Sequence, residues 1–341
     1  MEKRILQGEK QKAIIPFPLY LVVACLILLT THLLTVGYMG SASVVSLLTE
    51  TTVAAATPGA WRVIASAGTA PGKLTAPTYL AVDKQGNVYV SDTGNHRIQK
   101  LSPDGQPFAQ WGTSGHALGQ FKSPTGITVC SQGNIYAADM ETHSVHKLSP
   151  SGEPLGEWGR KGSRPGQFNN PQGVALDSHG NIYVADMSNC RIQKLSPNGR
   201  VLAEWGMGGS GPGQFTYPMG IALDTQGNVY VADWGNHRIQ KLSPEGGPLA
   251  QWGTKGTGPK QFNRPVGIAL DVLGNIYVVE QENNRIQKLS PEGEPLAQWG
   301  SEGSKPGHFD FPVGIAVDAK GNVYVAESAN SRIRKLPAKL E

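Results

Sequence analysis

The chain has 341 residues, with 30 lysines and arginines against 26 aspartates and glutamates, so its formal net charge is +4. Four of the basic residues lie within the first twelve positions, which leaves the rest close to neutral, without a surplus of positive charge to hold a phosphate backbone. Nucleic acid is therefore not an expected partner. The three cysteines (Cys25, Cys130 and Cys190) are too few and too scattered for a disulfide framework or a cysteine-rich zinc site.

The N-terminal region contains an apolar run from Leu19 to Val36, interrupted only by threonines and His32. A run of about 18 residues is at the short end of what crosses a hydrocarbon layer ~30 Å thick. We expect residues 1–18 to form a short cytoplasmic tail and residues 19–38 a transmembrane signal-anchor helix, because a basic flank stays in the cytoplasm. Everything after the helix would lie outside the membrane. The alternative is a cleaved signal with a small-residue site at residues 40–42, which would leave the protein secreted.

Residues 39–59 are rich in Ser, Thr and Ala and show no sustained periodicity. We expect them to form a linker, and a flexible tether of about 20 residues would span on the order of 25 Å. An extension of the preceding helix through Val44–Leu48 is the alternative.

The rest of the chain, residues 60–341, consists of six copies of one 47-residue unit. Three landmarks recur at this interval, namely an opening residue (Leu74, Phe121, Phe168, Phe215, Phe262, Phe309), a turn glycine (Gly86, Gly133, Gly180, Gly227, Gly274, Gly321) and a strand tyrosine (Tyr89, Tyr136, Tyr183, Tyr230, Tyr277, Tyr324). A fixed period of about 40–50 residues, built from short strands and turn residues, is typical of a β-propeller. The sequence therefore predicts an all-β, six-bladed propeller.

Each unit is expected to supply four strands, a to d, which in the fourth unit are residues 220–224, 228–233, 238–242 and 248–252. Gly227 and Gly246 fit the positions that close the a–b and c–d turns. The last unit ends after Arg332–Leu336, before any strand d, whereas Trp61–Ile64 lies upstream of the first unit at the distance of a strand d. We therefore predict four-stranded blades, with the N-terminal strand closing the last blade.

The segment Val231–Asp233, followed by Asn236–Lys241, resembles the NHL repeat, and all six units carry a version of it. The string Asn-x-Arg-Ile-Gln-Lys is intact in units one, three, four and five. Unit two departs most, with Thr142, Ser144 and His146 in place of Asn, Arg and Gln. The resemblance implies a propeller that relatives use as an interaction platform, an RNA-binding domain, an extracytoplasmic sensor or the scaffold of a lyase. Fold alone does not choose among these functions.

The acid that ends strand b faces the arginine that opens strand c across a four-residue turn. We expect each arginine to fork onto its own carboxylate and pin the hairpin. Five units contain such a structural pair: Asp92–Arg97, Asp186–Arg191, Asp233–Arg238, Glu280–Arg285 and Glu327–Arg332. Asp139 faces Ser144 instead, and a locally rewired turn is expected there rather than a catalytic acid.

Four consecutive units place His96, His143, Cys190 and His237 at one repeat position, and these are residue types that bind zinc. Equivalent positions at this radius of a sixfold ring lie more than ~10 Å apart, whereas ligands lie ~2 Å from a zinc ion, so no metal site is predicted. Connectivity places the b–c turns and d–a loops on one side of the disc, called here the b–c face. Cys190 lies on this face and Cys130 on the opposite one, which excludes a disulfide between them.

The residue after the strand-b acid varies between units and includes Met140, Met187 and Trp234. Together with the neighbouring histidines, these side chains form a candidate ligand-binding patch: His96, Met140, His143, Met187, Trp234 and His237. A protein or glycan ligand is the expected partner, and packing on the adjacent blade's loop is the alternative interpretation. No catalytic residue and no cofactor are predicted, and a metal-dependent lyase or lactonase-like enzyme is the alternative function.

Overall fold

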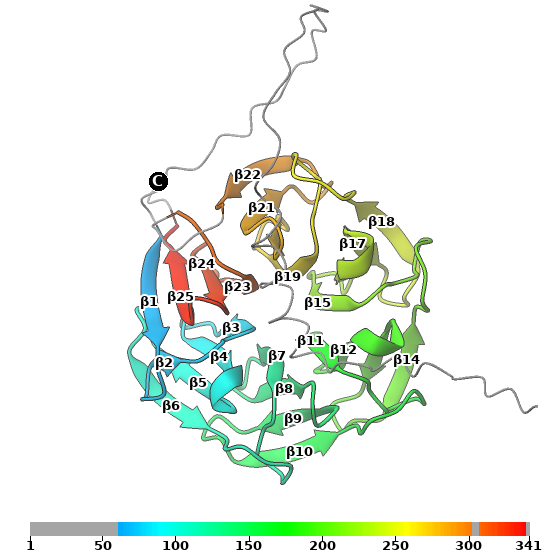
Figure 1. Cartoon of the computed structure of the whole chain (residues 1–341). Coiled ribbons are helices and arrows are strands. Elements are labelled where there is room, and N and C mark those ends of the chain that lie inside the picture. Colours follow the sequence, from blue (N-terminus) through cyan, green and yellow to red (C-terminus); the bar gives the residue numbers. More distant parts are fainter. Residues whose placement is uncertain (1–60, 302–306, 339–341) are drawn as a thin grey trace, which may run out of the picture. The chain divides into compact units, whose positions relative to one another are not determined.

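The computed structural model describes residues 61–301 and 307–338. Strands dominate these residues and are grouped in six sheets around a central axis (Figure 1). Single-turn 3-10 helices occupy the b–c turns of blades 1, 3 and 4, as η1 (Thr93–Asn95), η2 (Met187–Asn189) and η3 (Trp234–Asn236). The predicted all-β, six-bladed propeller with four-stranded blades is confirmed.

In blades 1 to 5 the strands follow one another from the axis outward in chain order, and in blade 6 a strand from the start of the propeller takes the outer position (Figure 1). Blade 1 contains β3 (Leu80–Val82), β4 (Val88–Asp92), β5 (Arg97–Leu101) and β6 (Pro107–Trp111), and blade 2 contains β7 (Pro124–Val129), β8 (Ile135–Asp139), β9 (Ser144–Leu148) and β10 (Pro154–Trp158). Blade 3 contains β11 (Pro171–Leu176), β12 (Ile182–Asp186), β13 (Arg191–Leu195) and β14 (Val201–Trp205), and blade 4 contains β15 (Pro218–Leu223), β16 (Val229–Asp233), β17 (Arg238–Leu242) and β18 (Pro248–Trp252). Blade 5 contains β19 (Pro265–Leu270), β20 (Ile276–Glu280), β21 (Arg285–Leu289) and β22 (Pro295–Trp299), and blade 6 contains β23 (Pro312–Val317), β24 (Val323–Glu327), β25 (Arg332–Leu336) and, from the start of the propeller, β1 (Arg62–Ala67).

The turn residues act as the sequence predicts. The Asp224 carboxylate accepts the backbone N–H groups of Gln226 and Asn228, and Gly227 closes the a–b turn at φ +83°. Gly246 closes the c–d turn at φ +87°, in a left-handed conformation that glycine adopts without steric cost. Strand a differs from expectation by starting at Pro218, because this proline pairs with Asp233 across a bulge.

The ring closes through the two ends of the propeller, as predicted. Strand β1 pairs antiparallel with β25, with Arg62 opposite Lys335 and Val63 opposite Arg334. The end of β1 then pairs in parallel with the short strand β2 (Lys73–Leu74), which makes this sheet five-stranded. Closure of this kind pairs the outer edge of β25, which would otherwise be left open.

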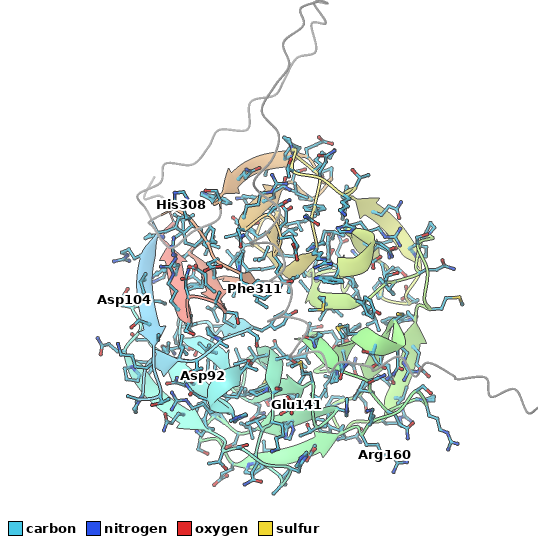
Figure 2. All side chains as sticks on the ribbon, viewed as in Figure 1. Asp92, Asp104, Glu141, Arg160, His308 and Phe311 are labelled. Atoms are coloured by element: carbon cyan, nitrogen blue, oxygen red, sulfur yellow. The ribbon has the colours of Figure 1, made fainter. Side chains whose placement is uncertain are left out.

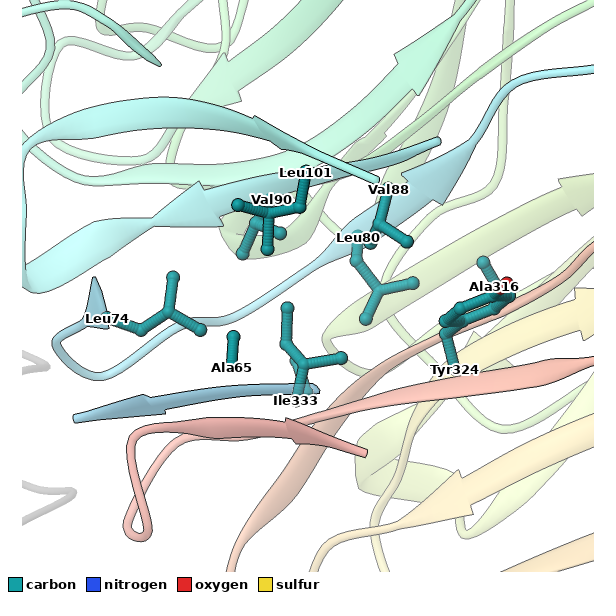
Figure 3. Close-up of a cluster of buried hydrophobic side chains, with 10 residues drawn as sticks. Ala65, Leu74, Leu80, Val88, Val90, Leu101, Ala316, Tyr324 and Ile333 are labelled. Atoms are coloured by element: carbon teal, nitrogen blue, oxygen red, sulfur yellow. The ribbon is translucent and has the colours of Figure 1, made fainter. Parts of the chain in front are cut away.

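The hydrophobic core lies between adjacent blades rather than within one sheet. In the cluster of Figure 3, Leu80, Val88 and Val90 of blade 1 lie in one group with Tyr324 and Ile333 of blade 6. Around the axis the innermost strands approach closely, since a Cβ added at Gly220 would lie 2.4 Å from the Val266 carbonyl oxygen. Blade 1 has Tyr79 at this repeat position, and its strand a is the shortest of the six.

The predicted tail (residues 1–18), signal-anchor helix (19–38) and linker (39–59) lie outside the described residues. Within 61–301 and 307–338, none of the helices has the length and apolar character needed to cross a membrane.

Trp61 tests the closure of the ring. This side chain is 7% exposed and packs edge-to-face on Phe309, with ring centroids 5.1 Å apart. We expect Trp61→Ala to lower the free energy of unfolding by about 3–5 kcal/mol, because it removes a buried aromatic anchor and leaves a cavity. Phe108→Ala, at a position that is 59% exposed, is the control and should change it by less than ~0.5 kcal/mol in urea denaturation. Equal losses from both variants would contradict the closing role of Trp61.

Candidate ligand-binding face

A buried carboxylate at the end of each strand b organises the b–c face. In blade 4 the Asp233 carboxylate is fully buried and accepts the Nε of Arg238 at 2.8 Å and the Nδ2 of Asn236 at 2.9 Å. It also accepts the Nε2 of Gln240 and the backbone N–H of Thr216, the latter from the d–a loop. We call Asp233, Asn236, Arg238 and Gln240, with their equivalents in the other blades, the clamp.

The five predicted pairs are ion pairs in the structure, with distances of 2.5 to 2.8 Å from the arginine Nε to the nearer carboxylate oxygen. The expected fork onto the carboxylate occurs only where the acid is glutamate. In blades 5 and 6 the arginine Nη2 also reaches the second oxygen of Glu280 (3.3 Å) or Glu327 (2.9 Å). Aspartate is one methylene shorter, so in the aspartate blades Nη2 reaches only other acceptors, whereas Arg285 in blade 5 uses such acceptors in addition to Glu280.

Those other acceptors are backbone carbonyls of the d–a loop. In blade 4 the Arg238 Nη2 donates to the carbonyl oxygens of Gly211 and Gln214, each at 2.8 Å, and Gln240 Nε2 donates to Gln214 as well. The arginine side chains of the five pairs are only 5 to 13% exposed. Their guanidinium groups are therefore hydrogen-bonded to the carboxylate and the loop, and these arginines do not form an anion site on the surface.

Blade 2 is built differently, as its sequence predicts. The Asp139 carboxylate accepts four backbone N–H groups, from residues 122, 123, 141 and 142, at 2.7 to 3.1 Å. Ser144 and His146 replace the arginine and glutamine, and the Ser144 hydroxyl lies 3.0 Å from His146 Nε2. This Nε2 is also 3.8 Å from a carboxylate oxygen of Glu157. Both contacts use one ring nitrogen and Ser144 is fully buried, so the group is not a nucleophile activated by a base.

The histidines of the b–c turns connect neighbouring blades. His143 Nδ1 accepts the backbone N–H of Asn170 in blade 3, and His237 Nδ1 accepts that of Arg264 in blade 5, each at 3.1 Å. Asn284 makes the equivalent bond with its Oδ1 in blade 5. The Nδ1 of His96 lies 2.5 Å from the Lys122 carbonyl oxygen, so this ring donates. The three histidines that the sequence placed in the ligand-binding patch thus form hydrogen bonds between neighbouring blades.

The apolar members of the predicted patch have separate environments. Met187 is only 3% exposed, so little of its side chain is open to a partner in this structure. Met140 is partly buried, and its sulfur lies 3.6 Å from the amide nitrogen of Gln172 in the next blade. Trp234 is partly exposed, which leaves it as the predicted patch residue with an aromatic surface toward solvent.

Trp234 belongs to a cluster that the sequence prediction did not include. The Tyr217 ring lies edge-on to it at 6.0 Å, and the Arg264 guanidinium carbon lies 4.4 Å from its ring centroid. Arg264 in turn forms a 2.7 Å ion pair with Glu282. Tyr217 is 44% exposed. We call Tyr217, Trp234, Arg264 and Glu282 the aromatic cluster; it spans blades 4 and 5 on the b–c face.

The signal that could have found Tyr217 and Arg264 is variation at the position before the strand-a proline. The residues there are Ala76, Ser123, Asn170, Tyr217, Arg264 and Phe311. All except Ser123 have a left-handed backbone, with φ between +44° and +57°. Figure 2 shows Phe311 near the centre of the ring and Glu141 part-way out along blade 2, both in loops of this face, whereas Asp104 and Arg160 lie at the rim.

No group of three or more His, Cys, Asp or Glu side chains within 61–301 and 307–338 is arranged to hold a metal ion. Cys130 and Cys190 are both free thiols.

The repeat decides the family. A model of the NHL repeat matches residues 74–101, 121–148, 168–195, 215–242, 262–289 and 309–336, one segment in each blade. The chain is an NHL-repeat β-propeller. None of the curated proteins matches its sequence.

Solved structures with the same fold differ widely in function. A protein of unknown function from Bacteroides thetaiotaomicron is 21% identical, with a TM-score of 0.63 over 81% of this chain and 75% of that one. A gluconolactonase from Xanthomonas campestris is 14% identical (TM-score 0.59; 79% and 88% covered). A virginiamycin B lyase from Staphylococcus aureus is 18% identical (TM-score 0.56; 82% and 89% covered). At these identities the likeness shows the fold alone.

The histidine bonds between blades make stability depend on pH. Burial lowers the pKa of His143 from about 6.5, assisted by the Lys161 charge, and burial lowers the pKa of His237, assisted by Lys255 and Arg264. Both rings are therefore harder to protonate in the folded chain than in the unfolded one. Their stabilising contribution is complete above about pH 6.5 and is lost as the pH falls toward the lowered folded pKa.

We expect the melting temperature to fall between pH 7.5 and 5.5, and the fall to be smaller in a His143→Asn/His237→Asn double variant. Asparagine makes the same bond in blade 5 and does not titrate. Differential scanning calorimetry at the two pH values measures the change, and an unaltered pH dependence in the double variant would contradict this role.

Proposed function

We propose that the propeller is a binding module, an interaction or sensor domain, that recognises a protein partner with its b–c face at the aromatic cluster. One observation carries the proposal. The blades have nearly the same scaffold residues, but they differ from one another at two places, the start of the b–c turn and the end of the d–a loop. The residues after the strand-b acid are Thr93, Met140, Met187, Trp234, Gln281 and Ser328.

The side chains of the cluster are of the type that dominates binding energy. Tyrosine, tryptophan and arginine are enriched among residues whose truncation costs an interface most. Tyr217 and Arg264 are 44% and, in the side chain, 40% exposed, and Trp234 lies between them. The clamps support this use, because they hold the d–a loops in place before a partner arrives and so reduce the ordering cost of binding.

We further propose that residues 19–38 anchor the protein in the membrane, with residues 1–18 in the cytoplasm and the propeller outside. The apolar run and the basic residues before it support this orientation. Secretion after cleavage near residues 40–42 is the alternative, and it also places the b–c face outside the cell.

The partner can be tested by affinity capture with the full-length chain in detergent, followed by titration of the captured protein. Trp234→Ala/Tyr217→Ala should weaken its binding at least about 30-fold, the effect expected for a hot spot of 2 kcal/mol or more. The control is Phe108→Ala, which removes an exposed ring on the rim.

Unchanged affinity in the double variant would contradict the assignment of this face. Capture of a glycan instead of a protein would contradict the proposed class of partner but not the assignment of the b–c face. A stoichiometric metal ion removed only by a strong chelator, together with unaltered partner capture by the double variant, would favour the lyase or lactonase alternative.

Membrane orientation has a separate test. Protease added to intact cells should degrade an epitope placed after Glu341 and spare one placed before Met1. Carbonate extraction should leave the chain in the membrane fraction, whereas release into the medium would show cleavage. Protection of the C-terminal epitope in intact cells would contradict the proposed orientation.

A further inference from the structure

We propose that blade 2 binds a guanidinium group supplied from outside the chain, at the position that each other blade fills with its own arginine. The ligand is either an arginine side chain of a peptide or a free guanidino compound. This site involves other residues than the aromatic cluster and does not depend on the proposed partner.

The other blades show how the fold holds a guanidinium. In blade 4 the Nε of Arg238 binds Asp233, Nη1 binds Gln251 Oε1 at 2.8 Å, and Nη2 binds two carbonyls of the d–a loop. These carbonyls lie 27 and 24 residues before the arginine. The same two offsets recur in blade 1 (Ala70 and Lys73), blade 3 (Arg164 and Gln167) and blade 5 (Gly258 and Gln261).

Blade 2 keeps the loop acceptors but lacks the donor. The equivalent carbonyls are those of Ala117 and Gln120, and no side chain in the described part of the protein donates to either. The loop nevertheless has the turn found in the other blades, with Gln120 N–H donating to Ala117 at 2.8 Å, as Gln214 N–H donates to Gly211 at 3.0 Å in blade 4. Phe121 N–H likewise donates to Thr113 at 3.0 Å. The loop has therefore not rearranged to compensate for the missing arginine.

Blade 2 also carries a carboxylate where a guanidinium would need one. Glu157 stands where blades 1, 4 and 5 have Gln110, Gln251 and Gln298, the side chains that accept Nη1. Blade 3 has Glu204 at this position, and it pairs with Arg191 Nη1. Among the described residues the ion-pairing group near Glu157 is His146, at 3.8 Å. A carboxylate beside two free carbonyl lone pairs matches the planar fork of a guanidinium better than a point charge such as an ammonium group.

His146, at the repeat position of the clamp glutamine, is itself incompletely hydrogen-bonded. It is 1% exposed, and its Nδ1 has no hydrogen-bond partner among the described residues, although buried polar atoms are nearly always paired. Burial lowers the pKa of His146, against the nearby Glu157 and Asp139 charges, so its neutral ring does not repel a cation. The acceptors of blade 2 can be reached from solvent, because Ala117 is exposed, Gln120 is partly exposed and the Glu157 side chain is 28% exposed.

The test is calorimetric titration of the full-length chain in detergent with N-propylguanidinium, using propylammonium at equal ionic strength as the control ligand. We expect saturable binding of one equivalent of the guanidinium compound and at least tenfold weaker binding of the amine. Ser144→Arg should abolish this binding, because it supplies the group internally. Glu157→Gln, the residue type of blades 1, 4 and 5, should weaken it at least tenfold.

Arg238→Ser in blade 4 is the matched positive control, since it should create a second equivalent of binding. Circular dichroism shows whether each variant is folded. If Arg238→Ser does not fold, the comparison of Glu157→Gln with the wild-type chain still tests the site. Binding of the tripeptide Gly-Arg-Gly as tightly as N-propylguanidinium would assign the site to peptide arginines, and much weaker tripeptide binding to free guanidino compounds. Absence of saturable binding to the wild-type chain, or equal binding to Ser144→Arg, would overturn the proposal.

Discussion

The b–c face depends on one contact, the buried carboxylate at the end of strand b that binds an arginine of strand c. A carboxylate removed from water is costly unless it is paired and hydrogen-bonded. Asp233 meets both conditions through Arg238, Asn236 and Gln240, and the arginine continues to the d–a loop carbonyls. Each clamp therefore joins a hairpin to a loop more than twenty residues upstream and holds that loop by hydrogen bonds to its carbonyls.

A second set of bonds joins several of the blades to their neighbours on the same face. His143 and His237 accept backbone N–H groups of the following blade, and Asn284 does the same. Since these residues hold left-handed backbone conformations, the turn shape and the bond between blades are set together. The scaffold leaves few positions on this face free to vary between blades. The aromatic cluster occupies several of these variable positions.

Blade 2 lacks the arginine and the glutamine of the clamp, and so it shows what these residues contribute in the other blades. Backbone N–H groups satisfy Asp139 in place of an arginine, so the buried carboxylate remains paired at the hairpin. The loop carbonyls do not gain a substitute side-chain donor among the described residues, and Glu157 lies 3.8 Å from His146 Nε2 instead of binding an arginine. A repeat protein tolerates such a departure because each blade contacts mainly its neighbours, so one altered blade does not disturb the others.

The 47-residue period, the turn glycines and the truncated last unit were enough to predict the blades and their closure, because these features depend on contacts within one unit or between the two ends of the ring. The acid–arginine pairs were equally accessible, since the two residues face each other across one short turn. The sequence did not predict the burial of Met187 or the contacts of Trp234 with Tyr217 and Arg264. Residues 17 to 30 positions apart meet there through the loop before strand a, in part across neighbouring blades, and only the packing of complete blades decides which side chains are covered.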